Sequence, residues 1–153
     1  MTDYELLCSQ VQEMIEADPR YVPALSNISA LLMETLPDLN WAGFYILHEN
    51  QLVVGPFQGK PACVHIQVGK GVCGTAVEKD EVINVPDVHQ FPGHIACDSA
   101  SNSEMVIPLH KDGKPAAVLD LDSPRTDRFT EADEAGLIRI AGAIERSVIW
   151  KER

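Results

Sequence analysis

Apolar residues recur every three or four positions near both ends of the chain, which is the spacing of one face of an α-helix. The first such stripe ends before Pro19, and the second begins near Pro23. A third follows Thr130, whose spacing to an acidic residue three positions on resembles a helix capping box. The pattern predicts two helices within residues 2–36 and one over residues 130–150, each with one face in the core.

The middle of the chain, residues 40–123, changes to the two-residue alternation that is typical of β-strands. Glu49-Asn50 separates two such runs, which predicts a β-hairpin. Helices at both ends and strands paired largely as hairpins predict one α+β domain over residues 1–153, with the helices on one face of a mostly antiparallel sheet. The six expected strands cover about residues 41–48, 51–57, 62–68, 82–88, 104–110 and 115–122.

The alternation also assigns the two faces of the sheet. On the first strand, Ala42 and Phe44 suit the face against the helices. Trp41 and Tyr45 then point to the opposite face, with Gly43 between them. We expect that opposite face to hold a pocket.

The last hairpin decides whether three carboxylates meet in this pocket. A two-residue turn at Asp112-Gly113 would set Glu104 on the face opposite to Asp120 and Asp122. A three-residue loop would instead place Glu104 directly across from Asp120, with Asp122 on the same face. Like charges across a sheet are destabilising, so such a cluster is either solvated and incidental or kept because it holds a cation or a proton. We favour the second interpretation.

The glycines from Gly69 to Gly74 match the spacing G-x-G-x-x-G of dinucleotide-binding loops. That motif opens a long helix inside a βαβ unit, whereas only a short helix to about Lys79 fits here and the flanking strands pair as hairpins. We therefore interpret the glycines as a tight turn that leads into a short helix.

Charge and composition exclude several classes of partner. The formal net charge is −11 and no basic cluster occurs, which argues against nucleic acids and anionic membranes. The chain has neither a leader-like start nor an apolar run of about 18 residues, so we expect a cytoplasmic location. Four cysteines in a reducing compartment indicate catalytic, redox or metal-binding roles rather than a disulfide framework.

Cys97 lies in the polar, turn-rich segment 89–103, which reads HQFPGHIACDSASNS and offers no apolar face for packing. A reactive thiol needs such access, so Cys97 is a candidate nucleophile. A zinc site is chemically conceivable, but its cysteines lack the usual close C-x-x-C pairs. Its ligands would be Cys63, Cys73 and Cys97 with one of His65, His89 and His94.

Several segments together resemble the free methionine-(R)-sulfoxide reductases, a family with the GAF-domain fold. These segments are NWAGFY from Asn40, GPFQGKPAC from Gly55, GKGVCGTA from Gly69, VPDVHQFPGHIACDSASNSE from Val85, and VLDLDS from Val118. The similarity covers roughly residues 25–150. It implies a GAF fold, with a six-stranded antiparallel sheet, helices on one side and a ligand cavity on the other, which agrees with the pattern of the chain.

By this resemblance Cys97 is the nucleophile, and Cys63 and Cys73 are the two candidates for resolving the sulfenic acid that it forms. Cys63 is slightly favoured, because Pro61 suggests a loop edge there while Cys73 has more packed neighbours. A sulfoxide must also be protonated to react, and crowded carboxylates raise the pKa of one member. We expect Asp122 or Glu104 to hold that proton. The residues implied around the substrate are Trp41, Tyr45, Glu104, Asp120 and Asp122.

The implied reaction is the reduction of free L-methionine (R)-S-oxide to methionine, without a metal or other cofactor. Cys97 would attack the sulfur, a second thiol would form an intramolecular disulfide, and a thioredoxin-like dithiol would reduce it. An exposed sheet edge or the N-terminal helix could support a homodimer. The alternative class is a GAF sensor that binds a small ligand without turnover, although a sensor has no need of three cysteines around its cavity.

Overall fold

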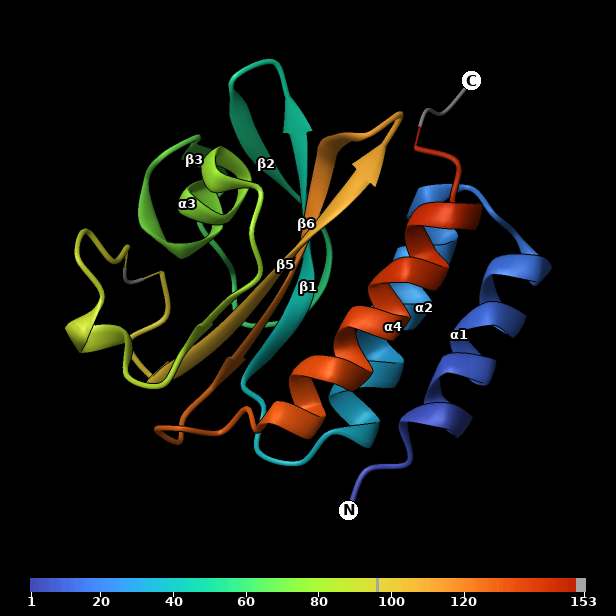
Figure 1. Cartoon of the computed structure of the whole chain (residues 1–153), viewed down its shortest axis with the longest axis horizontal. Coiled ribbons are helices and arrows are strands. Elements are labelled where there is room, and N and C mark those ends of the chain that lie inside the picture. The colour runs from blue at the N-terminus through green and yellow to red at the C-terminus, as the bar shows by residue number, and fades with distance from the viewer. Residues whose placement is uncertain (96, 151–153) are drawn as a thin grey trace.

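One antiparallel sheet with the strand order β3-β2-β1-β6-β5-β4 organises the chain (Figure 1). The computed structural model describes residues 1–95 and 97–150. The α+β architecture predicted from the sequence is confirmed. The strands are β1 (Trp41–His48), β2 (Gln51–Gly59), β3 (His65–Gln67), β4 (Ile83–Val85), β5 (Ser103–Lys111) and β6 (Lys114–Ser123).

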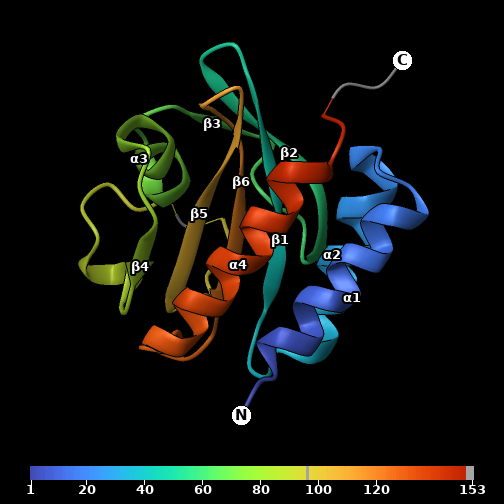
Figure 2. The ribbon, with the colours of Figure 1, turned by 45° about the vertical axis from the view of Figure 1, so that its right-hand side comes forward.

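Three helices cover one face of this sheet, and a short helix with long loops lies on the other, as Figure 2 shows from a second side. None of the described helices is long and apolar enough to cross a membrane. The covering helices are α1 (Tyr4–Ala17), α2 (Tyr21–Thr35) and α4 (Glu131–Ser147), and the short elements on the other side are α3 (Gly71–Lys79) and the 3₁₀-helix η1 (Val88–Gln90).

The two faces of the sheet carry separate apolar clusters, as the alternation on the first strand predicts. Ala42 and Phe44 are fully buried among residues of the covering helices. Trp41 and Tyr45 belong to the cluster on the opposite face. Gly43 between them leaves room for β2, because a Cβ atom there would lie 2.2 Å from the Cβ atom of Phe57. The alternation along β1 therefore correctly predicts which of its side chains reach the face away from the covering helices.

Three elements are shorter than expected, and each has a local cause. The expected strand 82–88 stops before Pro86, which cannot donate to a ladder, and Asp87 then caps η1. β3 begins only at His65, after Cys63, which is bonded to Cys97 in another loop. The last helix ends at Ser147, after which Ile149 forms a β-bridge with the segment before α2.

The β5–β6 hairpin follows neither predicted register unchanged. Its turn is the two-residue form, with Lys111 opposite Lys114, but a bulge between Leu109 and His110 shifts the pairing farther along. Glu104 therefore lies opposite Asp122 rather than Asp120, so that predicted pairing was wrong.

The bulge nevertheless brings the three carboxylates to one face. Asp120 pairs with Val106, which lies two residues from Glu104 on the same side of β5. Without the bulge, the two-residue turn would have set Glu104 on the helix side.

The glycine turn before α3 matches its interpretation from the sequence. Gly69 and Gly71 have φ angles of +90° and +62°, which favour glycine. The helix that follows has nine residues, and the strands described here all pair antiparallel. The loop therefore lacks the βαβ context of a dinucleotide site.

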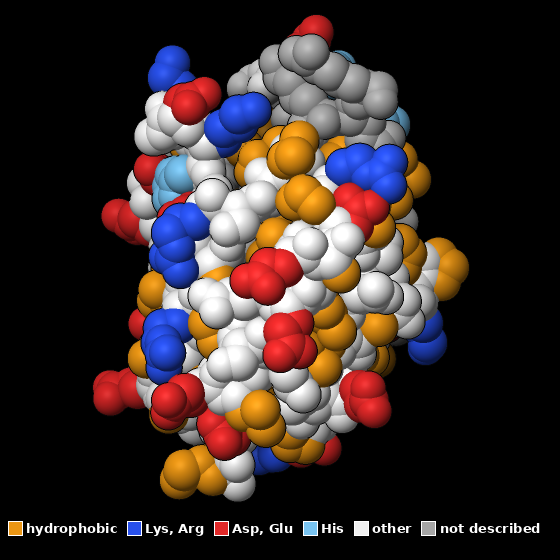
Figure 3. All heavy atoms as spheres, turned by 90° about the vertical axis from the view of Figure 1, so that its right-hand side faces the viewer, with side chains coloured by type: hydrophobic (Ala, Val, Ile, Leu, Met, Phe, Trp, Pro, Cys, Tyr) orange, Lys and Arg blue, Asp and Glu red, His pale blue; other side chains and the backbone are white. Residues whose placement is uncertain are grey.

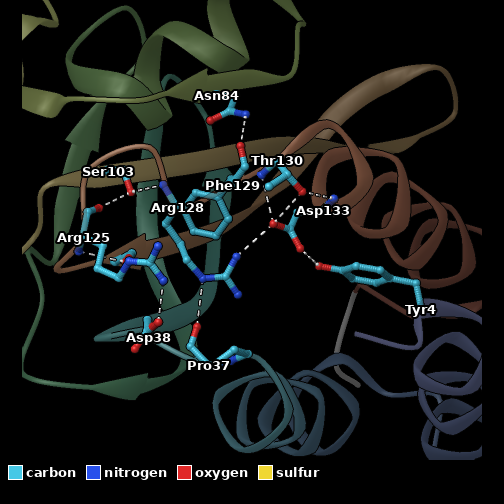
Figure 4. Close-up of polar contacts among 11 residues, drawn as sticks. Tyr4, Pro37, Asp38, Asn84, Ser103, Arg125, Arg128, Phe129, Thr130 and Asp133 are labelled. Carbon is cyan, nitrogen blue, oxygen red and sulfur yellow. Dashed lines mark hydrogen bonds and ion pairs between the residues drawn. The ribbon is translucent and has the colours of Figure 1, made fainter. Parts of the chain in front are cut away.

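A buried ion pair ties α1, α4 and the loop before β1 together (Figure 4). Arg128 Nη1 lies 2.9 Å from Asp133 Oδ2 and Arg128 Nε donates to the Pro37 carbonyl oxygen at 2.9 Å. Tyr4 Oη donates to Asp133 Oδ1 at 2.6 Å, and the predicted capping box of Thr130 with Asp133 is present. This network fixes α4 beside the end of the sheet where the carboxylates lie.

His110 joins β5 to two other elements. Its Nε2 lies 2.5 Å from Asp80 Oδ1 at the end of α3, and its Nδ1 lies 3.0 Å from Glu145 Oε2 on α4. The hydrogen bond with Asp80 is the main reason why the pKa of His110 lies above its ordinary value, and the hydrogen bond with Glu145 raises it further. A raised histidine pKa adds stability that is complete below the unfolded-state pKa of about 6.5 and is lost as pH rises through the folded-state pKa.

We therefore expect His110→Gln to destabilise the protein more at about pH 5.5 than at about pH 9, by on the order of 1 kcal/mol at most because the pair is partly exposed. Urea unfolding of both proteins at each pH measures this difference. His48→Gln, at the exposed end of β1, is the control. A difference in unfolding free energy that does not shrink with rising pH would contradict the assignment.

Candidate active site

A small cavity opens on the sheet face that α1, α2 and α4 leave free. Its volume is about 50 Å³, which is room for a few water molecules. β1, β5, β6, α3 and the loop after η1 all contribute to its wall. The lining includes all five predicted substrate residues and two of the predicted cysteines, namely Trp41, Tyr45, Glu104, Asp120, Asp122, Cys73 and Cys97.

The third predicted cysteine, Cys63, is bonded to Cys97 at the edge of this cavity. Their Cα atoms are 5.5 Å apart, and 34 residues separate them in sequence. Cys73 is a buried free thiol in α3, and Cys8 is a buried free thiol among the helices. The expected intramolecular disulfide is therefore present, and it joins the loop before β3 to the Cys97 loop.

Cys63 and Cys97, two of the three cysteines considered as zinc ligands, are bonded to each other and are not free to bind a metal ion in this structure. His65, one of the three histidines considered, is exposed on β3. A different set of donors lies close together. The donor atoms of Cys73, Glu104 and Asp120 are within 4.8 Å of one another and are buried, so these residues have the spacing to hold a metal ion.

The three carboxylates lie side by side, with Glu104 and Asp120 buried and Asp122 half-buried. Burial first, and then the charge of a neighbouring carboxylate, raises the pKa of Glu104, Asp120 and Asp122 well above the ordinary values. Three such groups cannot all be charged at little cost in one small cavity, so at least one holds a proton at neutral pH. Asp120 Oδ1 is buried and finds no hydrogen-bond partner among the described residues.

Cys73 differs chemically from the cysteines of the disulfide. Burial, and then the charges of Asp120 and Glu104, raise the pKa of its thiol well above the ordinary value. Its Sγ donates to Glu104 Oε2 at 3.9 Å. Cys73 is therefore held as a neutral thiol beside the carboxylates and is a poor nucleophile.

An aromatic stack forms the wall of the cavity on the side of β1 and β2. The Trp41 ring centroid lies 5.8 Å from the Tyr45 ring centroid and 5.1 Å from the Phe57 ring centroid, and both pairs of rings are stacked. Tyr45 Oη donates to the Cys63 carbonyl oxygen at 3.1 Å, which ties this wall to the disulfide. Trp41 Nε1 is buried and has no hydrogen-bond partner in the described part of the chain. The cavity thus has an apolar side next to its acidic floor, since Trp41 on β1 pairs with Asp122 on β6.

The GAF domain family matches residues 8–148. The free methionine-R-sulfoxide reductase of Escherichia coli (strain K12) is 52% identical to this chain over 133 residues, which are 87% of this chain and 81% of that protein. The chain belongs to the free methionine-R-sulfoxide reductases. This confirms the resemblance noted from the sequence segments.

Two solved structures extend the similarity to three dimensions. The reduced form of fRMsr of Staphylococcus aureus is 52% identical, with a TM-score of 0.94 over 97% of both chains. The free methionine-R-sulfoxide reductase of Neisseria meningitidis, solved in complex with its substrate, is 38% identical, with a TM-score of 0.91 over 94% of this chain and 87% of that one.

The sequence pattern of this reductase did not reveal the role of Asn40. Its backbone N–H donates to the Asp122 carbonyl oxygen at 2.9 Å. Its side-chain Nδ2 donates to Asp98 Oδ2 at 2.9 Å and to Ser101 Oγ at 3.0 Å. Asn40 therefore links the strand of the acidic floor to the residue that follows Cys97. It opens the segment NWAGFY, but its side-chain partners are about sixty positions away and only the fold identifies them.

Two further residues complete the surroundings of Cys97. Asp98 Oδ1 accepts from the Ala100 N–H at 2.9 Å, and this bond is the main reason why the pKa of Asp98 lies below the ordinary value. His94 Nε2 lies 3.9 Å from Glu104 Oε1, and burial lowers the pKa of its ring. Asp98 thus keeps its charge in a turn, and His94 stands over the acidic floor as a neutral ring at neutral pH.

Proposed function

We propose that this chain reduces free methionine-(R)-sulfoxide to methionine, with Cys97 as the nucleophile and Cys63 as the resolving thiol. The observation that carries the proposal is the Cys63–Cys97 disulfide at the edge of a cavity lined by three neighbouring carboxylates. The relatives named above support the choice of substrate, because two of them are named for its reduction.

The proposed reaction has three steps. The Cys97 thiol attacks the sulfoxide sulfur and takes up its oxygen, so that methionine leaves and Cys97 becomes a sulfenic acid. The Cys63 thiol then displaces water and forms the disulfide. An external dithiol, for which we propose a thioredoxin-like protein, returns two electrons and restores both thiols.

The sulfoxide oxygen needs a proton while its sulfur is attacked. We assign this proton to Asp122, with Glu104 as the alternative. Glu104 Oε2 accepts a hydrogen bond from Cys73 Sγ at 3.9 Å, and such a donor favours the charged form of Glu104. Asp122 lies directly across the sheet from Glu104, and burial first, then that charge, raises the pKa of Asp122.

The remaining carboxylates suit the α-ammonium group of a free amino acid. Asp120 offers a buried oxygen that has no partner among the described residues, so an ammonium group would satisfy it. A methionine within a peptide presents an uncharged amide there and would leave this carboxylate unpaired. Trp41 and Tyr45 supply the apolar wall for the S-methyl end. The small cavity and the bonded Cys97 indicate that substrate enters the reduced protein rather than this disulfide form.

Release of methionine by the reduced protein tests the proposal. The protein is given dithiothreitol and one of four substrates, which are the R and S sulfoxides of the free amino acid and of a blocked peptide. Turnover confined to the free R form is the expected result. No turnover on any of them, with the thiols shown to be free beforehand, would overturn the proposal in favour of a GAF ligand sensor.

Asn40 is expected to position the Cys97 loop for this reaction. Asn40→Asp sets a carboxylate against Asp98 and should lower kcat roughly tenfold, because a small misplacement of the nucleophile is costly. The reciprocal double variant, Asn40→Asp with Asp98→Asn, restores a donor and an acceptor and should recover most of the loss. Steady-state kinetics of the four proteins measure this coupling.

Asn84→Ala is the matched control, because the Asn84 amide donates to the Phe129 carbonyl oxygen at 2.9 Å away from the Cys97 loop. Its stability should fall while its kcat stays unchanged. A double variant whose loss of kcat equals the product of the two single losses would contradict the positioning role.

Three broader expectations remain part of the proposal. The whole chain, residues 1–153, acts as one domain, and its free thiols suit a cytoplasmic location. Figure 3 shows apolar side chains scattered among charged ones on the side of α1. Leu6 on α1 and Val22 on α2 are exposed. A homodimer through this helix layer would bury these two side chains. Sedimentation of the chain as a single species of dimer mass in equilibrium centrifugation would support the homodimer.

A further inference from the structure

The Cys63–Cys97 disulfide is flanked by exposed apolar side chains. Val64, next to Cys63, is 54% exposed, and Ile95, two residues before Cys97, is 39% exposed. The other large apolar side chains exposed in the described part of the chain lie on α1, α2 and α4 or near the chain ends, which are Met1, Leu6, Val22, Ile138 and Ile149. On the pocket side, exposed apolar surface of this kind is therefore concentrated beside the disulfide.

Contacts with neighbouring elements hold both residues in place. The Val64 carbonyl oxygen accepts from the Val54 N–H at 2.9 Å, which anchors it to β2. The Ile95 side chain lies against Gly71 at the start of α3, where a Cβ atom would be 3.1 Å from Ile95 Cδ1. The Cys97 N–H donates to the Ile95 carbonyl oxygen at 3.2 Å. The Val64 backbone and the Ile95 side chain are thus held next to the bonded cysteines.

Reduction of this disulfide requires close approach by another molecule. A thiolate of the partner attacks one sulfur and forms a mixed disulfide, while the other sulfur leaves as a thiolate. The second thiol of the partner then breaks the mixed disulfide, so the partner is oxidised by two electrons and both cysteines regain thiols. Because Cys63 and Cys97 are half-buried, a protein partner must rest on the residues around them.

We propose that Val64 and Ile95 form the docking surface for the protein dithiol that reduces the Cys63–Cys97 disulfide. The partner that fits is one whose reactive thiol is surrounded by apolar surface. Lys60 and Lys70 are exposed near the two cysteine loops in a chain of net charge −11, so acidic side chains at the edge of the partner complement this face. This inference rests on the proposed function, which requires an external dithiol.

The test measures reduction of the oxidised full-length protein without any sulfoxide. Thioredoxin serves as the protein dithiol and dithiothreitol as the small one. Acid quenching at set times, alkylation, and mass spectrometry of the chain itself give the two second-order rate constants for reduction of its disulfide. Val64→Ser should lower the thioredoxin rate constant roughly tenfold, because docking contacts of this size carry such an effect. Its dithiothreitol rate constant should stay the same. Ile95→Ser should lower the ratio of the two rate constants to a similar degree.

Ile138→Ser, at an exposed apolar site on α4, is the matched control and should change neither rate constant. Unchanged thioredoxin rate constants in both variants, or an equal fall with both reductants, would overturn the docking surface. If Ile95→Ser does not fold, the exposed Val64→Ser variant decides the question. Failure of the proposed function is seen separately, as absence of methionine release by the reduced protein.

Discussion

Cys97→Ser is expected to release no measurable methionine from the free R sulfoxide, a fall in kcat of at least roughly a thousandfold. A serine hydroxyl is too weak a nucleophile at neutral pH to take the oxygen from the sulfoxide, and it cannot form a sulfenic acid. The measurement is methionine release with excess dithiothreitol, with protein folding checked by circular dichroism.

Variants of two other cysteines are the controls for Cys97→Ser. Cys8→Ser changes a buried thiol among the helices and should keep full turnover. Without dithiothreitol, Cys63→Ser should still release one methionine per chain before it stalls as a sulfenic acid, because only the second step needs that thiol. Turnover by Cys97→Ser at a tenth or more of the normal rate would exclude Cys97 as the nucleophile.

Asp122→Asn is expected to lower kcat by about 10²–10⁴-fold, which is the range for loss of a general acid. The same variant should be more stable than the natural protein above about pH 6. A carboxyl whose folded-state pKa is raised contributes stability below its unfolded-state pKa of about 4, and this contribution is lost as pH rises toward the folded-state pKa. An amide never takes on that buried charge.

Two measurements check this prediction, the pH dependence of kcat and urea unfolding at about pH 5 and pH 8. The kcat of the natural protein should fall as pH rises through the raised pKa of its acid. Asp112→Asn, in the exposed β5–β6 turn, is the control and should alter neither activity nor stability. Full turnover by Asp122→Asn with an unchanged pH profile would contradict the assignment of Asp122 as the proton donor. Glu104 would then be the remaining candidate, or the reaction would need no carboxylic acid.

The layers of the fold follow from local patterns. Alternation on the first strand placed Phe44 in the helix-side core and Trp41 and Tyr45 on the pocket side, because side chains of a strand must alternate. The capping box of Thr130 placed the start of the last helix. These features depend on neighbours in sequence, so the sequence reveals them.

The pairing within the acidic floor depends on more distant geometry. A bulge beside His110 places Glu104 opposite Asp122, and nothing in the turn residues themselves specifies that bulge. The link from Asn40 to Asp98 and the bond between Cys63 and Cys97 join loops that are far apart in the chain. Spacing alone left Cys63 and Cys73 both open, whereas the structure bonds Cys63 and buries Cys73 against Glu104.

A single turnover of the fully reduced protein, without any external reductant, tests the central claim most directly. Substrate is the free R sulfoxide in excess, and the products are methionine, counted by chromatography, and disulfides, located by peptide mapping after alkylation. We predict one methionine per chain, the loss of two thiols, and a bond between Cys63 and Cys97, with Cys73 still open to alkylation after unfolding. Methionine released without loss of thiols, or a bond that includes Cys73, would contradict the account.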